Sequence, residues 1–413
     1  MGAYPLRRRC HNPAMTLLED ARALQDDLVQ FRRKMHREPE IGLQLPRTQE
    51  RVLAALDGLP LEVSTGSSLT SVTAVLRGSA AGQARRSVLL RGDMDALPVV
   101  ERSGVDFAAG GETMHACGHD LHTAMLVGAA RLLSAQRESL AGDVVFMFQP
   151  GEEGYDGAAH MVGEGVLDAT GHRVDAALAL HVTSGLLPRG LFASRPGPVM
   201  SAADVLRVTV RGAGGHGSSP HQAKDPIPAA CEMVTALQTF VTRRFNVFDP
   251  VVITIGAFHA GTVHNVIPDD ACFEATVRSF SRDAHERVLA ESVRVCQGIA
   301  AAHGLDVEAV AEELYPVTVN AAGSVDDLQD VIREVHGDNR FVELPNPVAG
   351  SEDFSRVLDE VPGVMAFLGA TPADRDPATA PYNHSPEAAF DDGVLADGVA
   401  VYAEFARRVL GAG

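Results

Sequence analysis

The fold class follows from the stretch Ser87-Val88-Leu89-Leu90-Arg91-Gly92-Asp93-Met94-Asp95, in which a short apolar run ends in polar residues. Two later apolar runs, residues 144–148 and 176–180, end in the same way and lead into residues 149–153 and His181. Because such runs alternate with longer helical patterns, we predict an α/β fold with a mixed, mainly parallel sheet flanked by helices. Polar residues at the carboxyl ends of these strands lie at the edge where open α/β sheets bind ligands.

The pattern changes at about residue 201. From there the chain reads as strand, helix, strand, strand, helix, strand, which is the order of a ferredoxin-like split βαβ unit. After residue 316 the α/β pattern returns. We therefore predict a discontinuous domain, residues 1–200 and 316–413, with an inserted ferredoxin-like α+β domain at residues 201–315. The six elements fall at residues 205–210, 228–241, 251–258, 271–279, 283–303 and 307–314.

Composition and charge limit the class of partner. The chain has 413 residues, of which 46% are hydrophobic and 22% are charged, as in a globular protein of two or three domains. Its 54 acidic residues outnumber 35 basic residues, and the formal net charge of −19 argues against binding to nucleic acid or to an anionic membrane. No stretch reaches the roughly 18–20 consecutive apolar residues of a membrane span.

The cysteines indicate a reducing compartment. Their number is odd and their spacing is wide, which does not suit a disulfide framework. Residues 1–10 carry three arginines but are followed by polar residues and proline, so we expect no secretory signal and predict a cytoplasmic protein. The cysteines are Cys10, Cys117, Cys231, Cys272 and Cys296.

The densest cluster of reactive residues lies in residues 114–122, just before a helical pattern at residues 123–133. Cys117 and His119 are two residues apart, so they can aim at one point from a loop but not from one face of a helix. A thiolate and an imidazole together suit Zn²⁺ or a similar metal. A buried cysteine beside a helix-capping histidine is the structural alternative.

The pair Glu152-Glu153 follows the strand at residues 144–148. On extended backbone, adjacent side chains point to opposite sides, so one carboxylate can bind a metal while the other acts on a water molecule. A metal hydrolase needs this division, because a base bound to the cation would lose basicity. The alternative is a solvated acidic turn.

Two further histidines complete a ligand set. His181 ends an apolar run, and His384 stands in the sequence Tyr382-Asn383-His384-Ser385-Pro386. A lone histidine is more often structural than a metal ligand. Together with Cys117, His119 and one glutamate, however, these residues provide five ligands, enough for two metals if one ligand or a water bridges.

Two other sequence motifs match only in part, because the residues around them differ from those that the motifs require. Residues 212–217 match G-x-G-x-x-G after a strand, but three prolines delay the helix that a dinucleotide site requires. His285-Glu286 resembles the start of H-E-x-x-H, but position 289 is leucine. We therefore expect neither a dinucleotide site nor a helical zinc-protease motif.

Taken together, these residues resemble the aminoacylase and hippurate hydrolase branch of the dinuclear metallopeptidases, which includes the plant indole-acetyl-amino acid amidohydrolases. The resemblance covers essentially the whole chain. The matching segments are residues 33–40, 114–122 and 149–153, Gly214-Gly215-His216, Asn265-Val266-Ile267-Pro268, Gly350-Ser351-Glu352-Asp353-Phe354 and Asn383-His384-Ser385-Pro386.

The resemblance implies two divalent metal ions per subunit and a role for each residue of the cluster. Glu152 would be the general base, and Cys117 would take the bridging place that aspartate holds in more distant relatives. Those relatives have a His-x-Asp ligand motif where this chain has Asp93-Met94-Asp95, so we expect Asp95 to orient His119 from behind. The implied metal ligands are Cys117, His119, Glu153, His181 and His384.

The resemblance also implies that the inserted domain acts as a lid and forms a homodimer. His216 and Asn265 match lid residues that reach an active site, often that of the partner subunit. Arg278, Gly350 and Ser351 match positions that hold a substrate carboxylate. The structural alternatives are a solvated loop histidine for His216 and an ordinary surface-paired residue for Arg278.

The resulting hypothesis is hydrolysis of the amide bond of an N-acyl amino acid by metal-activated water, with Glu152 as general base and His216 holding the oxyanion. The nearest alternative is a dipeptidase or carboxypeptidase with the same metal centre. A noncatalytic protein that binds amino acid conjugates is a second alternative. The acyl group, the amino acid and the metals, among Zn²⁺, Mn²⁺, Co²⁺ and Ni²⁺, stay open.

Overall fold

The computed structural model describes residues 16–80 and 86–411. Residues 1–10, from which we expected no secretory signal, lie outside the described residues, and so does Cys10. The chain divides into two compact units, and residues 346–355, inside the range predicted for the discontinuous domain, group with the second. The first unit comprises Met1–Gly197, Asn320–Pro345 and Arg356–Gly413; the second comprises Pro198–Val319 and Asn346–Ser355.

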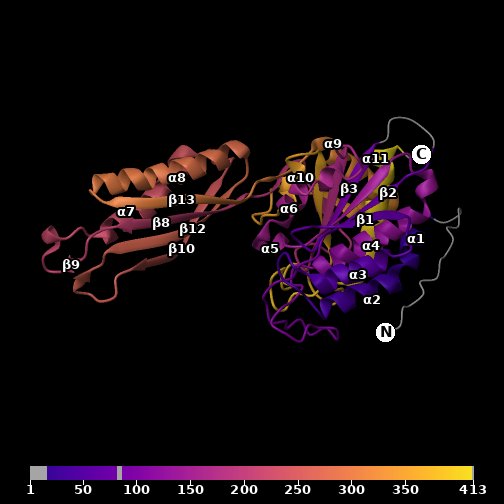
Figure 1. The fold of residues 1–413 in the computed structure, drawn as a ribbon, viewed down its shortest axis with the longest axis horizontal. Helices are drawn as coiled ribbons and strands as arrows, with labels where there is room; N and C mark the ends of the chain where they lie inside the picture. Colours follow the sequence, from indigo (N-terminus) through magenta and orange to yellow (C-terminus); the bar gives the residue numbers. More distant parts are fainter. Residues whose placement is uncertain (1–15, 81–85, 412–413) are drawn as a thin grey trace. The chain divides into compact units, whose positions relative to one another are not determined.

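Within its described residues the first unit is built on an eight-stranded mixed sheet (Figure 1). The pairs β4–β3, β3–β5, β5–β16 and β6–β15 are parallel, and the other neighbours are antiparallel. The predicted mixed, mainly parallel sheet is therefore confirmed. The strand order is β1 (Leu61–Thr65), β2 (Val72–Arg77), β4 (Asp143–Gln149), β3 (Ser87–Asp93), β5 (Ala176–Thr183), β16 (Gly363–Gly369), β6 (Phe192–Ser194) and β15 (Phe341–Glu343).

The register of the parallel strands brings their polar ends to one edge. Asp93 at the end of β3 pairs with Gln149 at the end of β4, and His181 near the end of β5 pairs with Phe367 of β16. Strands β3, β4 and β16 are buried along their whole length, as expected for parallel strands covered on both faces. The residues that follow β3, β4 and β5 therefore share one rim of the sheet.

Helix α4 lies in the core of the first unit. Almost all of its residues are buried, which is typical of a helix surrounded by other elements. It packs against β3 and α11, and the Tyr402 hydroxyl of α11 donates to the Arg91 carbonyl (2.7 Å) and accepts from the Leu180 amide (2.9 Å). This tyrosine fixes β3 and β5 just before their polar ends. The longer helices are α1 (Leu17–Ala23), α2 (Gln25–His36), α3 (Pro46–Leu56), α4 (His119–Ala135), α9 (Ala322–His336) and α11 (Leu395–Leu410).

The second unit contains a four-stranded antiparallel sheet in the order β10-β12-β8-β13, with helices α7 and α8 packed against it (Figure 1). Alternate residues of the strands, such as Leu206 and Val208, form one apolar cluster with Met233 of α7 and Val288 of α8. This order confirms the predicted ferredoxin-like arrangement. The elements are β8 (Ala203–Arg211), α7 (Pro226–Arg244), β10 (Val251–Ala260), β12 (Asp270–Ser279), α8 (Arg282–Ala302) and β13 (Asp306–Tyr315).

None of the described helices combines the length and apolar character that crossing a membrane requires. The cysteines within the described ranges, Cys117, Cys231, Cys272 and Cys296, all carry free thiols.

Candidate metal centre

A tight turn places Cys117 and His119 at the start of α4. Gly118, between them, has a φ of 84°, in the left-handed region that favours glycine. A Cβ at this position would lie 2.3 Å from the Cγ2 methyl of Val182, so a larger residue would have to displace the end of β5. The helix therefore begins at His119, and Gly118 at the end of the preceding loop packs against Val182 of β5.

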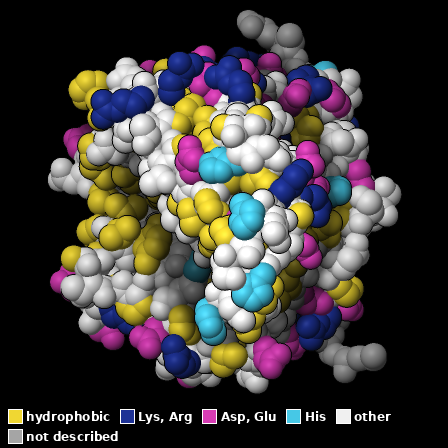
Figure 2. All heavy atoms as spheres, turned by 90° about the vertical axis from the view of Figure 1, so that its left-hand side faces the viewer, with side chains coloured by type: hydrophobic (Ala, Val, Ile, Leu, Met, Phe, Trp, Pro, Cys, Tyr) yellow, Lys and Arg dark blue, Asp and Glu magenta, His cyan; other side chains and the backbone are white. Residues whose placement is uncertain are grey.

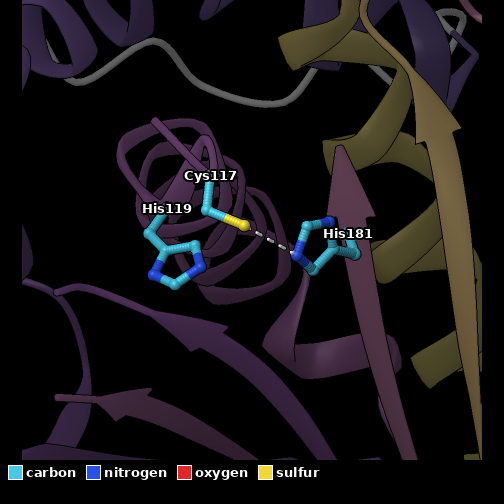
Figure 3. Close-up of side chains that lie close together, drawn as sticks. All are labelled: Cys117, His119 and His181. Atoms are coloured by element: carbon cyan, nitrogen blue, oxygen red, sulfur yellow. Dashed lines mark hydrogen bonds between the residues drawn. The ribbon is translucent and has the colours of Figure 1, made fainter. Parts of the chain in front are cut away.

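Cys117, His119 and His181 form one compact group, in which the sulfur and one nitrogen of each ring lie within 4.8 Å of one another. The Cys117 sulfur is 3.4 Å from His181 Nε2 (Figure 3). Cys117 comes from the loop before α4, His119 is the first residue of α4, and His181 comes from the end of β5, so the helix begins inside residues 114–122 and not after them. The polar rim of the sheet thus provides the sulfur and nitrogen donors that borderline metals prefer.

The imidazoles of this group are oriented by hydrogen bonds at Nδ1. His119 Nδ1 lies 3.3 Å from Asp95 Oδ1, and His181 Nδ1 lies 2.9 Å from the Val182 carbonyl oxygen. An acceptor at Nδ1 holds the proton there and leaves the Nε2 lone pair of each neutral ring free for a metal. Burial lowers the pKa of His181 well below its usual range, which favours this neutral form. Burial also acts to lower the pKa of His119, but attraction to Asp93 and the hydrogen bond to Asp95 outweigh it and raise that pKa, so His119 must lose a proton to bind a cation.

A second group contains Cys117, Glu153 and His384. His384 Nε2 lies 3.3 Å from the Cys117 sulfur and 3.2 Å from Glu153 Oε1. The hydrogen bonds to Cys117 and Glu153 outweigh burial and raise the pKa of His384 to about 10. Cys117 belongs to both groups, so its sulfur lies where one ligand could serve two cations.

The prediction that Glu152 and Glu153 lie on extended backbone and point to opposite sides is wrong. They lie in a short turn, α5 (Glu152–Tyr155), in which the backbone angles of Glu153 (φ −74°, ψ 70°) and Gly154 (φ 84°, ψ 10°) are not helical, and oxygens of both carboxylates lie within 4.8 Å of a His119 nitrogen. Asp95 causes this turn, because its carboxylate accepts from the backbone amides of Glu152 (3.1 Å) and Glu153 (3.0 Å). Gly151, with a φ of 73°, ends the extended conformation of β4.

Two buried atoms indicate that a cation fits this arrangement. Within the described residues, His119 Nε2 is buried and makes no hydrogen bond, and the neighbour of the buried Glu153 Oε1 is His384 Nε2 at 3.2 Å. Leaving such a group unsatisfied costs about 1–3 kcal/mol or more, so a buried acceptor normally has a partner. Both atoms belong to the ligand groups above, and sulfur, nitrogen and oxygen donors of this kind suit divalent transition metals.

Asp93 and His122 form a supporting contact that the sequence analysis did not identify. The His122 Nδ1–H donates to Asp93 Oδ1 (2.5 Å), and the Val182 amide donates to His122 Nε2 (2.7 Å). Asp93 is also paired with Arg91, so its charge is already compensated within the protein. Although Asp93, His119 and His122 lie close enough for a third metal group, this pairing favours a structural role for Asp93 and His122.

In the second unit, His216 and Asn265 lie side by side. His216 in β9 (Gly215–His216) pairs with Val266 in β11 (Val266–Ile267), and the Gly217 amide donates to the Asn265 carbonyl (2.9 Å). Both residues are exposed. Figure 2 shows several histidine side chains at the surface of the face that it draws. The Ser218 backbone amide donates a hydrogen bond to His216 Nδ1 (3.2 Å). The Ser218 hydroxyl oxygen lies 2.8 Å from the same nitrogen.

Arg278, Gly350 and Ser351 also belong to the second unit. Arg278 in β12 is half-buried, and its Nη1 makes no hydrogen bond to any described residue. Burial lowers the pKa of this guanidinium, and attraction to Asp204 partly offsets the effect. The Gly350 carbonyl accepts from the Ser201 amide (2.9 Å), which fixes the loop that leads into Ser351.

Residues 89–408 match the family described as peptidase family M20/M25/M40. The chain is 37% identical over 392 residues to thermostable carboxypeptidase 2 of Saccharolobus solfataricus, covering 94% of this chain and 96% of the relative. It is 33% identical over 381 residues to N-acetyl-L-cysteine deacetylase of Bacillus subtilis, with 91% and 88% covered. It is 35% identical over 399 residues to an IAA-amino acid hydrolase of Arabidopsis thaliana, with 93% and 86% covered.

The fold is also similar to a solved structure described as a dinuclear metal-binding peptidase of the same family from Bacillus subtilis. The TM-score is 0.80 at 30% sequence identity, and the match covers 95% of this chain and 100% of the other.

Proposed function

Since the chain belongs to peptidase family M20/M25/M40 and is a metal-dependent amidohydrolase with a dinuclear centre, we propose that it cleaves the amide bond between an acyl group and an amino acid. The observation that carries the proposal is the pair of ligand groups that share Cys117 and lie beside Glu152. A divalent pair polarises a carbonyl and lowers the pKa of bound water, which is the chemistry that amide hydrolysis requires.

In this proposal Glu152 is the general base. Its side chain is buried, and Asp95 holds its backbone amide, so the carboxylate has a fixed position beside Glu153 and His119. Glu152 takes a proton from the attacking water and returns it to the leaving amine. In the same proposal Glu153 is a metal ligand, together with Cys117, His119, His181 and His384.

The second unit provides the proposed substrate contacts. The Ser218 amide can only donate, so His216 Nδ1 accepts and the neutral ring carries its proton on Nε2. His216 can therefore donate from Nε2 to a developing oxyanion. Arg278 has a buried Nη1 available for a carboxylate, and we assign Asn265, Gly350 and Ser351 to the same substrate.

We further propose that this unit forms a homodimer and acts as a lid, and that the protein is cytoplasmic. Strands β10 and β13 are the edges of the second sheet, and an exposed edge strand offers backbone groups to another chain. The free thiols suit a reducing compartment, where Cys117 stays available as a ligand.

A carboxypeptidase is the second candidate, because one relative with 37% identity has that name. Both reactions need the same ligands and the same base. They differ in the group on the acyl side of the scissile bond: a simple acyl or aroyl group in one case and an amino acid residue in the other.

A substrate panel separates these candidates. The protein is stripped with a chelator, reloaded with Zn²⁺, Mn²⁺, Co²⁺ or Ni²⁺ in turn, and assayed with N-acetyl and N-benzoyl amino acids and with dipeptides. We expect kcat/KM to be highest for an N-acyl amino acid. Faster turnover of dipeptides would favour the peptidase, and the absence of metal-dependent hydrolysis across the panel would indicate a noncatalytic binder.

A further inference from the structure

Asn383 lies at the point where the three segments that carry Cys117, His181 and His384 meet. It directly precedes His384 in the chain, and its side chain reaches the loop of Cys117 and the end of β5. These contacts join residues separated by 266 and 201 positions in the sequence.

The orientation of the Asn383 amide is fixed by Ser184. The Ser184 backbone N–H donates at 2.9 Å to the amide oxygen, and the Ser184 hydroxyl lies 3.1 Å from the same oxygen. A backbone N–H can only donate, so the atom that faces it must be Oδ1. The Nδ2 group of Asn383 therefore points to the opposite side, toward the metal-centre loops.

Three acceptors face this Nδ2 group. The Val182 carbonyl oxygen lies at 3.0 Å, the Cys117 carbonyl oxygen at 3.3 Å and the Cys117 sulfur at 3.7 Å. An amide has two N–H groups, so one serves Val182 and the other is shared between the two atoms of Cys117. The Val182 carbonyl also accepts from His181 Nδ1, which links Asn383 to the orientation of that imidazole.

The backbone of His384 needs such support. His384 has a φ of 72°, a conformation that side-chain-bearing residues adopt only when their surroundings hold them. Its amide donates to the Ala116 carbonyl (2.9 Å), next to Cys117. Asn383 therefore holds the same loop from one side while His384 bonds to it from the other.

We propose that Asn383 is a positioning residue of the metal centre, in addition to Asp95: its amide holds Cys117, His181 and His384 in one arrangement and donates a hydrogen bond to the Cys117 sulfur. Hydrogen bonds behind metal ligands set both ligand geometry and the basicity of the donor atom. The inference rests on the proposed ligand set but not on the identity of the substrate.

The test replaces Asn383 with aspartate, which has nearly the same shape. Asn383→Asp keeps an oxygen for Ser184 and places a second oxygen against the Val182 carbonyl and both atoms of Cys117. The probe is Co²⁺, whose thiolate charge-transfer absorption reports the cobalt–sulfur bond, and its affinity is measured by competition with a chromophoric chelator. We expect affinity to fall about 10- to 100-fold and the charge-transfer band to shift.

Asn320→Asp is the matched control. The Asn320 amide also joins separate segments, since Nδ2 donates to the Arg195 and Met365 carbonyl oxygens (3.0 Å each) and Oδ1 accepts from the Met365 amide (2.8 Å). It contacts none of the proposed ligands. We expect this variant to unfold at a lower temperature but to keep the cobalt affinity and the band of the wild type.

The outcomes separate the possible explanations. An unchanged band and affinity in Asn383→Asp, or an equal loss in Asn320→Asp, would overturn the positioning role. If Asn383→Asp does not fold, Asn383→Ser provides the same measurement with the amide donors removed. A wild-type protein that binds Co²⁺ without a thiolate band would refute Cys117 as a ligand and this inference with it, whereas hydrolysis of an unexpected substrate would affect only the proposed function.

Discussion

Replacing Asp95 with asparagine should weaken metal binding through a residue that we do not place among the ligands. The Asp95 carboxylate lies 3.3 Å from His119 Nδ1 and accepts from the amides of Glu152 (3.1 Å) and Glu153 (3.0 Å). Asparagine has one acceptor oxygen, so its NH₂ group must face at least one of these three donors. Losing a hydrogen bond to a charged acceptor costs about 1.5–3 kcal/mol, which corresponds to roughly 10- to 100-fold in affinity.

The assay is chelator competition for Zn²⁺ or Co²⁺ at constant pH, together with thermal unfolding of the metal-free protein. Asp204→Asn provides a matched control, because Asp204 is a buried carboxylate that pairs with His285 (2.9 Å) in the second unit. We expect the control to change stability without changing metal affinity. Metal affinity of Asp95→Asn within about twofold of wild type would refute the proposal that Asp95 orients His119 and the glutamate turn.

Three further predictions use the same measurements. Cys117→Ala should lose most of its bound metal, since the sulfur belongs to both ligand groups, and full occupancy by elemental analysis would contradict its ligand role. Gly118→Ala should lower the unfolding temperature, because its Cβ would lie 2.3 Å from a Val182 methyl at a φ of 84°, and an unchanged temperature would show that the turn adapts. Burial acts to lower the pKa of His285, but the hydrogen bond and attraction to Asp204 outweigh it and raise that pKa. The pair therefore stabilises the fold fully at pH values below the unfolded-state pKa of about 6.5. This stabilisation is lost as the pH rises through the pKa of the folded state. The difference in unfolding temperature between wild type and His285→Gln should therefore shrink as the pH rises from the unfolded value of about 6.5 through the raised folded value, and a difference that grows with pH would refute this sign.

The fold could be predicted from the sequence because its signals are local. The apolar run at residues 87–90 ends in polar residues within the same nine-residue stretch, and the ferredoxin-like unit shows its order directly along the chain. Periodicity and strand-end composition report the neighbours of a residue in sequence. For the same reason, a helix could be expected from the pattern at residues 123–133, although α4 begins at His119, four residues before that pattern.

The arrangement of the site depends on contacts that the local sequence does not contain. Pro150 and Gly151 mark a turn before Glu152 and Glu153, but the two amides are held by Asp95, which lies 57 and 58 positions earlier. Asn383 directly precedes His384 in the sequence, but its hydrogen-bond partners Ser184 and Val182 lie 199 and 201 positions away along the chain. Side-chain roles set by such distant hydrogen bonds become visible only in three dimensions.

The central claim is that Glu152 acts as general base beside a dinuclear centre whose ligands it does not provide. The most direct measurement is kcat for Glu152→Gln on the best N-acyl amino acid, with the metal content of the same sample determined by elemental analysis. We predict that kcat falls by about 10²- to 10⁴-fold while two metal ions per subunit remain bound. Activity close to that of the wild type in a fully loaded variant, or loss of metal together with activity, would contradict the account.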